Sequence, residues 1–364
     1  MSKKALAAVM VEKEKIELQE FEIPKIRSDD ALLRVEAVGI CGSDYGQYYG
    51  KLKAFGIDFP VIPGHENLGY IEEIGDKAAK QWGVKEGDRV IIEGLIPCHY
   101  CQNCLAGNYR ICSNSMGYGT FLSSTVPPYL WGGYSQYMYL HPNTIVHKIA
   151  EKVRAEEAVL FVAIANGIRW AQQVPKTGIG DTVVILGPGQ QGLGCVIGAK
   201  EAGAFPVIIA GLTQDKKRLE VAKTFGADHV IDVQQEDLVE RVRDITEGSM
   251  ADIVIEAAGS LEAQSLMLDL VRAGGTVILA GVTGAKPIPN MIGDRIVHKE
   301  IKIQGVMTHD FRAVIPAIRL IESGKYPLAK MSTHTFSLER ADIAIRTVGR
   351  EVSGEEPIHV TIVP

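Results

Sequence analysis

Residues 181–211 restrict the possible folds of this chain more than any other stretch. An apolar, β-branched run over residues 183–186 enters a Gly-x-Gly-x-x-Gly turn that begins at Gly187. Small residues then lead to Gly203, and a second apolar run ends at Gly211. A strand, a glycine-rich turn, a helix and a second strand in this order are typical of a βαβ unit that binds a dinucleotide. Glycines also mark ordinary turns, but the two flanking strands favour a dinucleotide site.

Each glycine of this turn has a distinct role in the prediction. Gly187 lets the chain turn tightly, Gly189 lets backbone N–H groups approach a pyrophosphate, and Gly192 lets helix and strand pack closely. The phosphates would face the N-terminus of the helix, where N–H groups have no partner within the helix. We therefore assign these glycines, with Gln190 and Gln191 between them, to the cofactor site.

Strand and helix patterns alternate along the chain from Thr182 to about Val306. Strands are predicted over residues 183–186, 207–210, 227–231, 253–256, 276–280 and 301–306, and helices over residues 216–225, 238–246 and 261–272. Six strands with crossover helices predict a doubly wound parallel sheet, which binds its ligand at the carboxyl ends of the strands.

The first 150 residues have a different pattern, rich in strands and turns. Residues 31–39 and 88–93 are predicted strands, and residues 151–173 have helical periodicity. The tail after Asp310 holds another helix pair and a strand over residues 358–363, and we expect it to return to the first domain because it is too short for a third. The predicted α/β organisation is a β-rich domain over residues 1–155 and 307–364 and a dinucleotide-binding domain over residues 156–306.

Composition excludes several classes of partner. With 364 residues, 46% of them hydrophobic, the chain can bury a full core and should hold two domains. The formal net charge of −6 argues against a nucleic-acid or anionic-membrane surface. No uninterrupted apolar segment approaches the roughly 18 residues of a membrane span, and the N-terminus lacks a secretory apolar run, so we predict a cytoplasmic protein.

Cys98, Cys101, Cys104 and Cys112 form the second informative cluster. Four thiolates at this spacing can surround one tetrahedral zinc ion, with Gly107 in the turn that brings the last cysteine round. The alternatives are an iron–sulfur cluster, a redox pair or buried thiols. A redox pair needs two sulfurs, however, and this segment, here called the cysteine lobe, offers four. A zinc-ribbon nucleic-acid module is disfavoured because the second Cys-x-x-Cys is missing and the chain is acidic. The cluster predicts a structural zinc site.

A third cluster joins the motif Gly-Ile-Cys-Gly-Ser-Asp, which ends at Asp44, to Gly-His-Glu, which ends at Glu66. With the cysteine lobe and the glycine-rich unit, it closely resembles the zinc-containing branch of the medium-chain dehydrogenase/reductase superfamily, the group of alcohol, sorbitol and threonine dehydrogenases. The resemblance covers essentially the whole chain. It implies a GroES-like catalytic domain interrupted in sequence by the dinucleotide domain, and an active site between them. We expect a small-molecule alcohol or carbonyl substrate and a homo-oligomer, either a dimer or a tetramer.

The resemblance also implies roles for individual residues. Cys41 and His65 would be ligands of a catalytic zinc ion, and Ser43 would be the first group of a proton relay. Asp44 would orient His65 through its other ring nitrogen. Zinc acting as a Lewis acid lowers the pKa of an alcohol, whose carbon then gives a hydride to the nicotinamide. The expected reaction is the reversible NAD(P)-dependent oxidation of an alcohol to a ketone or aldehyde.

The chain departs from the family pattern at two places. A third metal ligand is expected before the glycine-rich unit, but counting back from Gly187 leads to Val162 or Ala163, which cannot bind zinc. Our hypothesis is that Glu66 supplies the carboxylate and leaves one position open for water or substrate; a weakly occupied zinc site is the alternative. Many relatives have a relay histidine where this chain has Tyr45, so the proton could leave through Tyr45, the cofactor ribose or water.

The sequence indicates only in part whether the cofactor is NAD or NADP. An NAD site requires an acidic residue about 20 positions after the turn, but the second predicted strand ends in Gly211-Leu-Thr213 without a carboxylate. Lys216 and Arg218, just beyond, could meet a 2′-phosphate or form a solvated helix face, and we favour NADP slightly over NAD. Small residues at two later strand ends resemble the nicotinamide contacts of the family: Ala257, Gly281 and Val282.

The substrate is the least constrained feature. Residues 113–132 form an aromatic, proline-containing loop that could wall a roomy apolar pocket or pack against a neighbouring subunit. The pocket interpretation predicts a secondary alcohol, bulky or cyclic. The alternative function is a medium-chain reductase of an enone-type acceptor without catalytic zinc, and a nucleotide-binding sensor without turnover is a third. The intact motifs around Cys41 and His65 oppose both alternatives.

Overall fold

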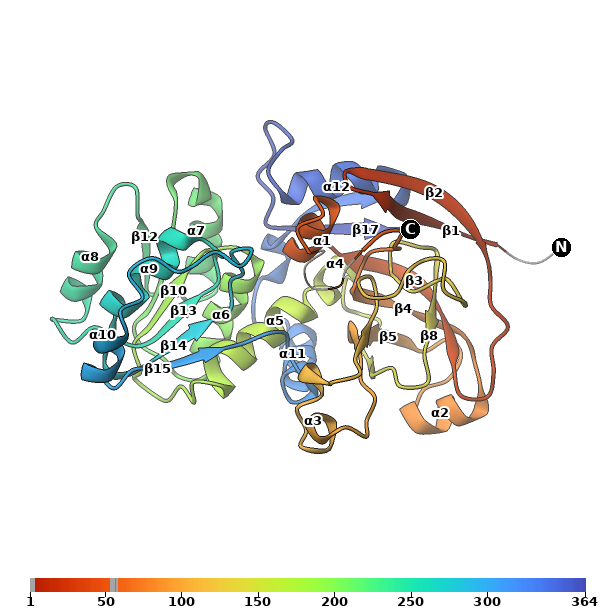
Figure 1. Ribbon diagram of the computed structural model, residues 1–364, viewed down its shortest axis with the longest axis horizontal. Coiled ribbons are helices and arrows are strands. Elements are labelled where there is room, and N and C mark those ends of the chain that lie inside the picture. Colours follow the sequence, from red (N-terminus) through yellow and green to blue (C-terminus); the bar gives the residue numbers. More distant parts are fainter. Residues whose placement is uncertain (1–3, 53–55, 57) are drawn as a thin grey trace. The chain divides into compact units, whose positions relative to one another are not determined.

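The computed structural model describes residues 4–52, 56 and 58–364, and residue packing divides the chain into two compact units (Figure 1). The first unit spans residues 1–161, 321–323 and 328–364, and the second spans residues 162–320 and 324–327. The domain boundaries at residues 155/156 and 306/307 stay predictions.

The first unit consists mainly of strands. Its strands are β1 (Lys4–Glu12), β2 (Lys15–Glu22), β3 (Ala31–Gly39), β4 (Glu66–Ile74), β5 (Arg89–Ile92), β6 (Leu95–Ile96), β7 (Met116–Gly117), β8 (Tyr137–Leu140), β9 (Val146–Lys148), β16 (Ser332–Ser337) and β17 (His359–Val363). Its helices are short: α1 (Gly42–Tyr48), α2 (Asp76–Trp82), α3 (Gln102–Leu105), α4 (Ala155–Ala158), α12 (Ala341–Val348), and the single turns η2 (Tyr109–Ile111), η5 (Leu328–Lys330) and η6 (Leu338–Arg340).

The main sheet of this unit has the order β16-β17-β3-β4-β5-β9, with β8 also paired to β3. Strands β17, β3 and β4 are antiparallel neighbours, and their register places Thr361, Gly39 and Glu66 in one row. Directly opposed residues point to the same face of a sheet. The row therefore puts two polar side chains on one face, on either side of a glycine. The strands predicted over residues 31–39 and 358–363 are confirmed as β3 and β17.

The second unit alternates strands and helices. Its strands are β10 (Val183–Leu186), β11 (Val207–Gly211), β12 (His229–Asp232), β13 (Ala251–Glu256), β14 (Val271–Leu279) and β15 (Lys302–Gly305). Its helices are α5 (Phe161–Ile168), η3 (Arg169–Gln173), α6 (Gln190–Glu201), η4 (Thr213–Asp215), α7 (Lys216–Thr224), α8 (Leu238–Ile245), α9 (Leu261–Leu270), α10 (Gly293–His298) and α11 (Phe311–Ser323), the last of which ends in the first unit.

The sheet of the second unit is parallel, in the order β12-β11-β10-β13-β14-β15 (Figure 1). Every residue of β10 is buried, as expected for a strand covered on both faces. Helix α6 packs on β10 and β11, and α9 packs on β13 and β14. The predicted doubly wound sheet is thus confirmed. Its strand order reverses between β10 and β13, where such sheets bind ligands outside the carboxyl ends.

The structure differs from the predicted helices at two places. The helix predicted over residues 151–173 is interrupted after α4, where the chain passes from the first unit to the second, and it ends in the π-helical turn η3. The helix predicted over residues 261–272 ends at Leu270. Val271, which is β-branched and buried, already pairs with Ala251 in the parallel sheet.

Candidate active site

Cys41 lies at the N-terminus of α1, directly after β3. Its backbone N–H donates to Oδ2 of Asp44 at 2.8 Å, and this bond closes the first turn of the helix. The backbone N–H of Ile40 donates to the carbonyl oxygen of Val360 in β17 at 2.9 Å. The position of the Cys41 thiol is therefore set by β3, β17 and α1 together.

His65 precedes β4, and its ring contacts Asp44 on one side and Ser43 on the other. Its Nδ1 lies 3.5 Å from Oδ1 of Asp44, and its Nε2 lies 3.3 Å from Oγ of Ser43. Burial disfavours the charged ring, but the Asp44 carboxylate and Cys41 outweigh burial and raise the pKa of His65 above its usual value. The Asp44 carboxylate thus lies beside one ring nitrogen, where it can orient the ring.

Glu66 is buried next to His359. Its Oε2 lies 3.3 Å from Nε2 of His359, and both side chains are almost completely enclosed. A Cβ atom at Gly39 would lie 2.3 Å from that oxygen and 2.8 Å from Nε2 of His359. The glycine therefore leaves the space in which the two side chains meet.

Cys41, His65 and Glu66 offer one ligand atom each, and these atoms lie within 4.8 Å of one another. Oε1 of Glu66 is buried, and it has no hydrogen-bond partner among the residues that the structure describes. A buried carboxylate oxygen without a partner is costly, and a cation would satisfy it. Sulfur, nitrogen and oxygen donors together fit a zinc ion with one open coordination position.

The four lobe cysteines, Cys98, Cys101, Cys104 and Cys112, also have their sulfur atoms within 4.8 Å of one another. The backbone N–H of Cys98 donates to Sγ of Cys112 at 3.4 Å, and that of Cys101 donates to Sγ of Cys98 at 3.3 Å. Backbone hydrogen bonds, from Cys104 and Ser113, lower the pKa of Cys101 to about 6. All six cysteines of the chain are free thiols. Four converging sulfurs fit one tetrahedral zinc ion.

The glycine-rich turn joins β10 to α6. Gly187 has a φ of 99°, and a Cβ atom there would lie 2.7 Å from Cα of Ala258. A Cβ atom at Gly192 would lie 1.9 Å from the carbonyl oxygen of Gly187. Gly189 is the N-cap of α6, and its Cβ position is open. The turn thus combines a tight bend, close helix contact and accessible N–H groups, as pyrophosphate binding requires.

Two of the residues that the sequence assigns to the cofactor, Thr213 and Arg218, lie just after β11. Oδ2 of Asp215 accepts a hydrogen bond from the backbone N–H of Leu212 at 3.0 Å, and Oδ1 lies 3.6 Å from Nη1 of Arg218. Oγ1 of Thr213 donates to Oδ2 of Asp232 at 2.7 Å. Asp232 is the last residue of β12. The sequence pattern did not predict that its carboxylate lies beside the end of β11.

Gly281 and Val282 follow β14, and Ala257 follows β13. The last residue of β13, Glu256, is buried, and its Oε1 accepts from two backbone N–H groups of the turn after β13 at 2.8 and 2.7 Å. A Cβ atom at Gly281 would lie 2.4 Å from Oε2 of Glu256. Glu256 therefore holds the turn after β13 at the carboxyl edge of the sheet, and the absence of a side chain at Gly281 leaves room for its carboxylate.

Residues 27–151 match the family model of the alcohol dehydrogenase GroES-like domain, and residues 192–323 match that of the zinc-binding dehydrogenases. A probable alcohol dehydrogenase of Mycobacterium tuberculosis is 38% identical, over 98% of both chains. The erythritol/L-threitol dehydrogenase of Mycolicibacterium smegmatis is 33% identical, over 95% of this chain and 94% of its own. The chain belongs to the zinc-type medium-chain dehydrogenases.

Solved structures agree with this membership. A candidate zinc-binding dehydrogenase from Sinorhizobium meliloti, bound to NADP, has a TM-score of 0.87 and 26% identity over 100% of both chains. A protein from Escherichia coli CFT073 that is named a short chain alcohol dehydrogenase, in complex with NADH, has a TM-score of 0.85 and 25% identity over 100% of both chains. The chain is thus an NAD(P)-dependent alcohol dehydrogenase with a GroES-like and a Rossmann domain. Across the described residues, no helix is both long enough and apolar enough to span a membrane.

The dehydrogenase offers no metal ligand at the expected third position. Val162 and Ala163 are buried in α5, and their side chains contain only carbon and hydrogen. Glu156 and Glu157 lie in α4, where Glu156 faces Arg154 with 3.7 Å between Oε2 and Nε. The acid that lies with the cysteine and the histidine is Glu66.

Some aromatic side chains of the loop over residues 113–132 are buried, and others are exposed. Tyr118 and Trp131 are buried in the core of the first unit, and the Tyr118 hydroxyl lies 2.6 Å from Oγ1 of Thr144. Phe121 and Tyr129 are exposed. An apolar pocket wall or a subunit contact built from this loop would therefore use Phe121 and Tyr129.

Sequence reasoning missed His359 and Gly39 as parts of the site. His359 lies 293 positions from Glu66 in the chain, and the register of β17, β3 and β4 brings the two together. A lone histidine at the start of an apolar terminal strand was the available signal. It does not distinguish a partner of Glu66 from an ordinary strand residue.

Proposed function

We propose that this chain is a zinc-dependent dehydrogenase that interconverts a secondary alcohol and its carbonyl compound. Cys41, His65 and Glu66 would hold the catalytic zinc ion, and the four lobe cysteines would hold a structural one. The observation that carries this proposal is the convergence of three ligand atoms within 4.8 Å around a buried carboxylate oxygen without a partner. When bound, zinc supplies Lewis acidity and the nicotinamide exchanges a hydride.

The residues of the chain position these groups and move the proton. The Asp44 carboxylate accepts a hydrogen bond from the Cys41 backbone and lies 3.5 Å from the His65 ring, where it would orient both ligands. Ser43, with its Oγ 3.3 Å from His65, receives the hydroxyl proton of the alcohol and returns it during carbonyl reduction. The His359 ring, 3.3 Å from Oε2 of Glu66, positions the Glu66 carboxylate.

Beyond Ser43, the proton leaves through the cofactor ribose or water. The Tyr45 hydroxyl donates to Oε1 of Glu351 at 2.8 Å, and Tyr49 donates to Oε2 of the same carboxylate at 2.7 Å. Burial, together with the hydrogen bond to Glu351, raises the pKa of Tyr45 above its usual value. A phenol with a raised pKa, whose hydroxyl already donates a hydrogen bond to Glu351, is a poor proton carrier, which supports the other two routes.

The cofactor is NADP in our proposal, with NAD as the alternative. Lys216 and Lys217 begin α7, and cations in the first turn of a helix oppose its dipole. A 2′-phosphate there would offset that repulsion, whereas Asp215 is already bonded to its own turn. Lys216→Ala should lower kcat/KM for NADP+ and change that for NAD+ little. An equal effect on both cofactors would contradict the assignment.

The substrate class can be tested with a panel of secondary alcohols. A relative is named erythritol/L-threitol dehydrogenase, which supports a polyol, whereas the exposed aromatic residues Phe121 and Tyr129 support a bulky or cyclic alcohol. Preferred oxidation of erythritol or sorbitol would favour a polyol substrate, and preferred oxidation of cyclohexanol would favour a bulky or cyclic one. The homo-oligomer remains a prediction that light scattering can test.

Cys41→Ala is the direct test of the zinc-dependent reaction. The variant should lose alcohol-dependent reduction of NADP+ or NAD+ by at least about a thousandfold, because one of three ligands is removed. Gly42→Ala is a matched control, since a Cβ atom at Gly42 meets no atom within 4 Å. Full turnover by Cys41→Ala would refute the proposal and favour an enone reductase without catalytic zinc.

A further inference from the structure

A buried carboxylate in the first unit, that of Glu93, directly follows β5 and has a partner on each of its oxygens. Its Oε1 lies 2.8 Å from Nε2 of His147 in β9, and the Glu93 and His147 side chains are 2% and 3% exposed. Its Oε2 accepts a hydrogen bond from the Tyr109 hydroxyl at 2.6 Å. Water has almost no access to this carboxylate, so the loss of either partner would leave a buried oxygen unpaired, which is costly.

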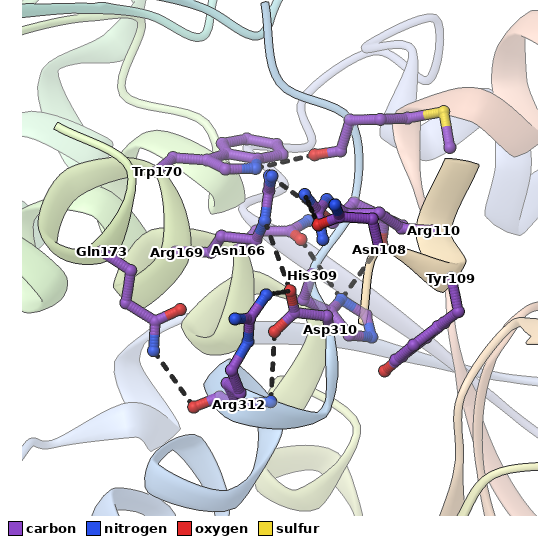
Figure 2. Close-up of polar contacts among 12 residues, drawn as sticks. Asn108, Tyr109, Arg110, Asn166, Arg169, Trp170, Gln173, His309, Asp310 and Arg312 are labelled. Atoms are coloured by element: carbon purple, nitrogen blue, oxygen red, sulfur yellow. Dashed lines mark hydrogen bonds and ion pairs between the residues drawn. The ribbon is translucent and has the colours of Figure 1, made fainter. Parts of the chain in front are cut away.

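Tyr109 belongs to the cysteine lobe, in the single turn η2. The backbone N–H of Cys112 donates to the carbonyl oxygen of Tyr109 at 2.9 Å, so the fourth cysteine of the lobe is tied to this turn. Nη2 of Arg110 donates to Oδ1 of Asn108 at 3.1 Å, and Figure 2 shows that the Tyr109 ring points away from both side chains. The hydrogen bond from Tyr109 to Glu93 therefore joins the lobe to the end of β5.

The end of β5 lies beside the proposed zinc ligand His65. Strands β4 and β5 are antiparallel, and their register pairs Asn67 with Ile92. Continued by two residues, this register places Gly94 opposite His65. A Cβ atom at Gly94 would lie 3.1 Å from both the Cβ atom and the carbonyl oxygen of His65, so the two backbones approach closely there. The segment that Glu93 holds thus packs directly against His65.

The base of the cysteine lobe also contacts this segment. Strand β6 leads into the lobe, β7 leads out of it, and the two strands pair antiparallel. The backbone N–H of Tyr118, which follows β7, donates to the carbonyl oxygen of Gly94 at 2.8 Å. A Cβ atom at Gly119 would lie 2.5 Å from the carbonyl oxygen of Gly64, the residue before His65. Backbones in such close contact leave little room for one to move without the other. A displacement of the lobe is therefore carried to His65.

We propose that Glu93 is a positioning residue that couples the cysteine lobe to the metal ligand His65. The inference rests on the proposed function, because it requires a metal ion at the catalytic site. A folded lobe keeps the Tyr109 hydroxyl on Glu93, and Glu93 keeps Gly94 against His65. His147 holds the same carboxylate from within the sheet, so the end of β5 is fixed between lobe and strand. The lobe thereby sets how firmly the catalytic site holds its metal ion.

Release of zinc from the purified protein to a chromogenic chelator tests this coupling without any need for turnover. Zinc per chain is measured first, and the release phase that is missing in Cys41→Ala belongs to the catalytic site. Two variants are compared with the wild type: Tyr109→Phe, which removes one hydroxyl and keeps the ring, and Glu93→Gln, whose amide cannot accept from both partners. Tyr100→Phe is the matched control, because Tyr100 lies in the same lobe and is 71% exposed. Circular dichroism checks that each variant is folded.

Zinc should leave the catalytic site at least about tenfold faster in Tyr109→Phe and Glu93→Gln than in the wild type, as expected when a group that orients a metal ligand is lost. Release from the lobe, whose four ligands are intact, should change little, and Tyr100→Phe should match the wild type in both phases. A wild-type rate of release from the catalytic site in the folded variants overturns the inference. Equal acceleration of both phases, or acceleration of the lobe phase alone, also overturns it, because neither is specific to His65. A wild type that holds only about one zinc ion per chain refutes the proposed function itself.

Discussion

Gly39→Ala should remove the catalytic zinc ion and leave the fold intact. The new Cβ atom would lie 2.3 Å from Oε2 of Glu66, whereas ordinary contacts begin at 3.4 Å, so the carboxylate has to move by about 1.1 Å. Metal–ligand distances tolerate changes of about 0.2 Å. The opposing His359 ring, 2.8 Å from the same Cβ position, is buried and cannot absorb the shift. The carboxylate therefore leaves its coordinating position.

The cost to folding should be moderate. Overpacking of a buried site costs about 1–3 kcal/mol, which is a minor part of the roughly 5–15 kcal/mol by which domains are stable. The assay is elemental zinc per chain together with a thermal melt, with Gly42→Ala as the control. Zinc should fall from about two ions to about one in Gly39→Ala and stay at about two in Gly42→Ala. Undiminished zinc in a folded Gly39→Ala protein would refute the role given to Glu66.

Two further predictions concern the lobe and the strand ends. Cys98→Ser should lower the zinc content by about one ion per chain and lower the melting temperature, because the lobe loses one of four ligands; unchanged zinc would contradict this. In Glu256, burial raises the carboxyl pKa above 4.5 despite hydrogen bonds from Gln264 and the following turn. The folded protein thus holds this proton more tightly than the unfolded chain, so stability should fall as pH rises through the raised pKa. Thermal melts between pH 5 and pH 8 should show a smaller fall for Glu256→Gln, and an identical pH dependence would contradict the burial argument.

Local patterns predicted the elements of the second unit well. The alternation of apolar runs and helical stretches identified all six strands. Residues of β10, β11 and β13 are almost all buried, so these strands are continuous apolar runs in the sequence. The roles of Gly187 and Gly192 could be predicted from local sequence too, since tight bends and close helix contacts require the absence of a side chain wherever they occur.

Contacts between distant segments could not be predicted in this way. His359 meets Glu66 because β17 lies beside β3, and Asn166 meets His309 across 143 positions of sequence. Strand order and helix docking decide such pairs, and neither periodicity nor spacing encodes them. The interruption between α4 and α5 was not predicted for the same reason. The chain passes there from the first compact unit to the second, and long-range packing decides where this happens.

The proposed reaction depends most directly on zinc bound by Cys41, His65 and Glu66. The measurement that tests this is elemental zinc per chain, on protein purified without added metal, for the wild type and for Glu66→Gln, which keeps the side-chain shape. We expect about two zinc ions in the wild type and about one in the variant, with loss of alcohol oxidation. About one zinc ion in both proteins would mean that the cysteine lobe alone is loaded, and would contradict a catalytic zinc site.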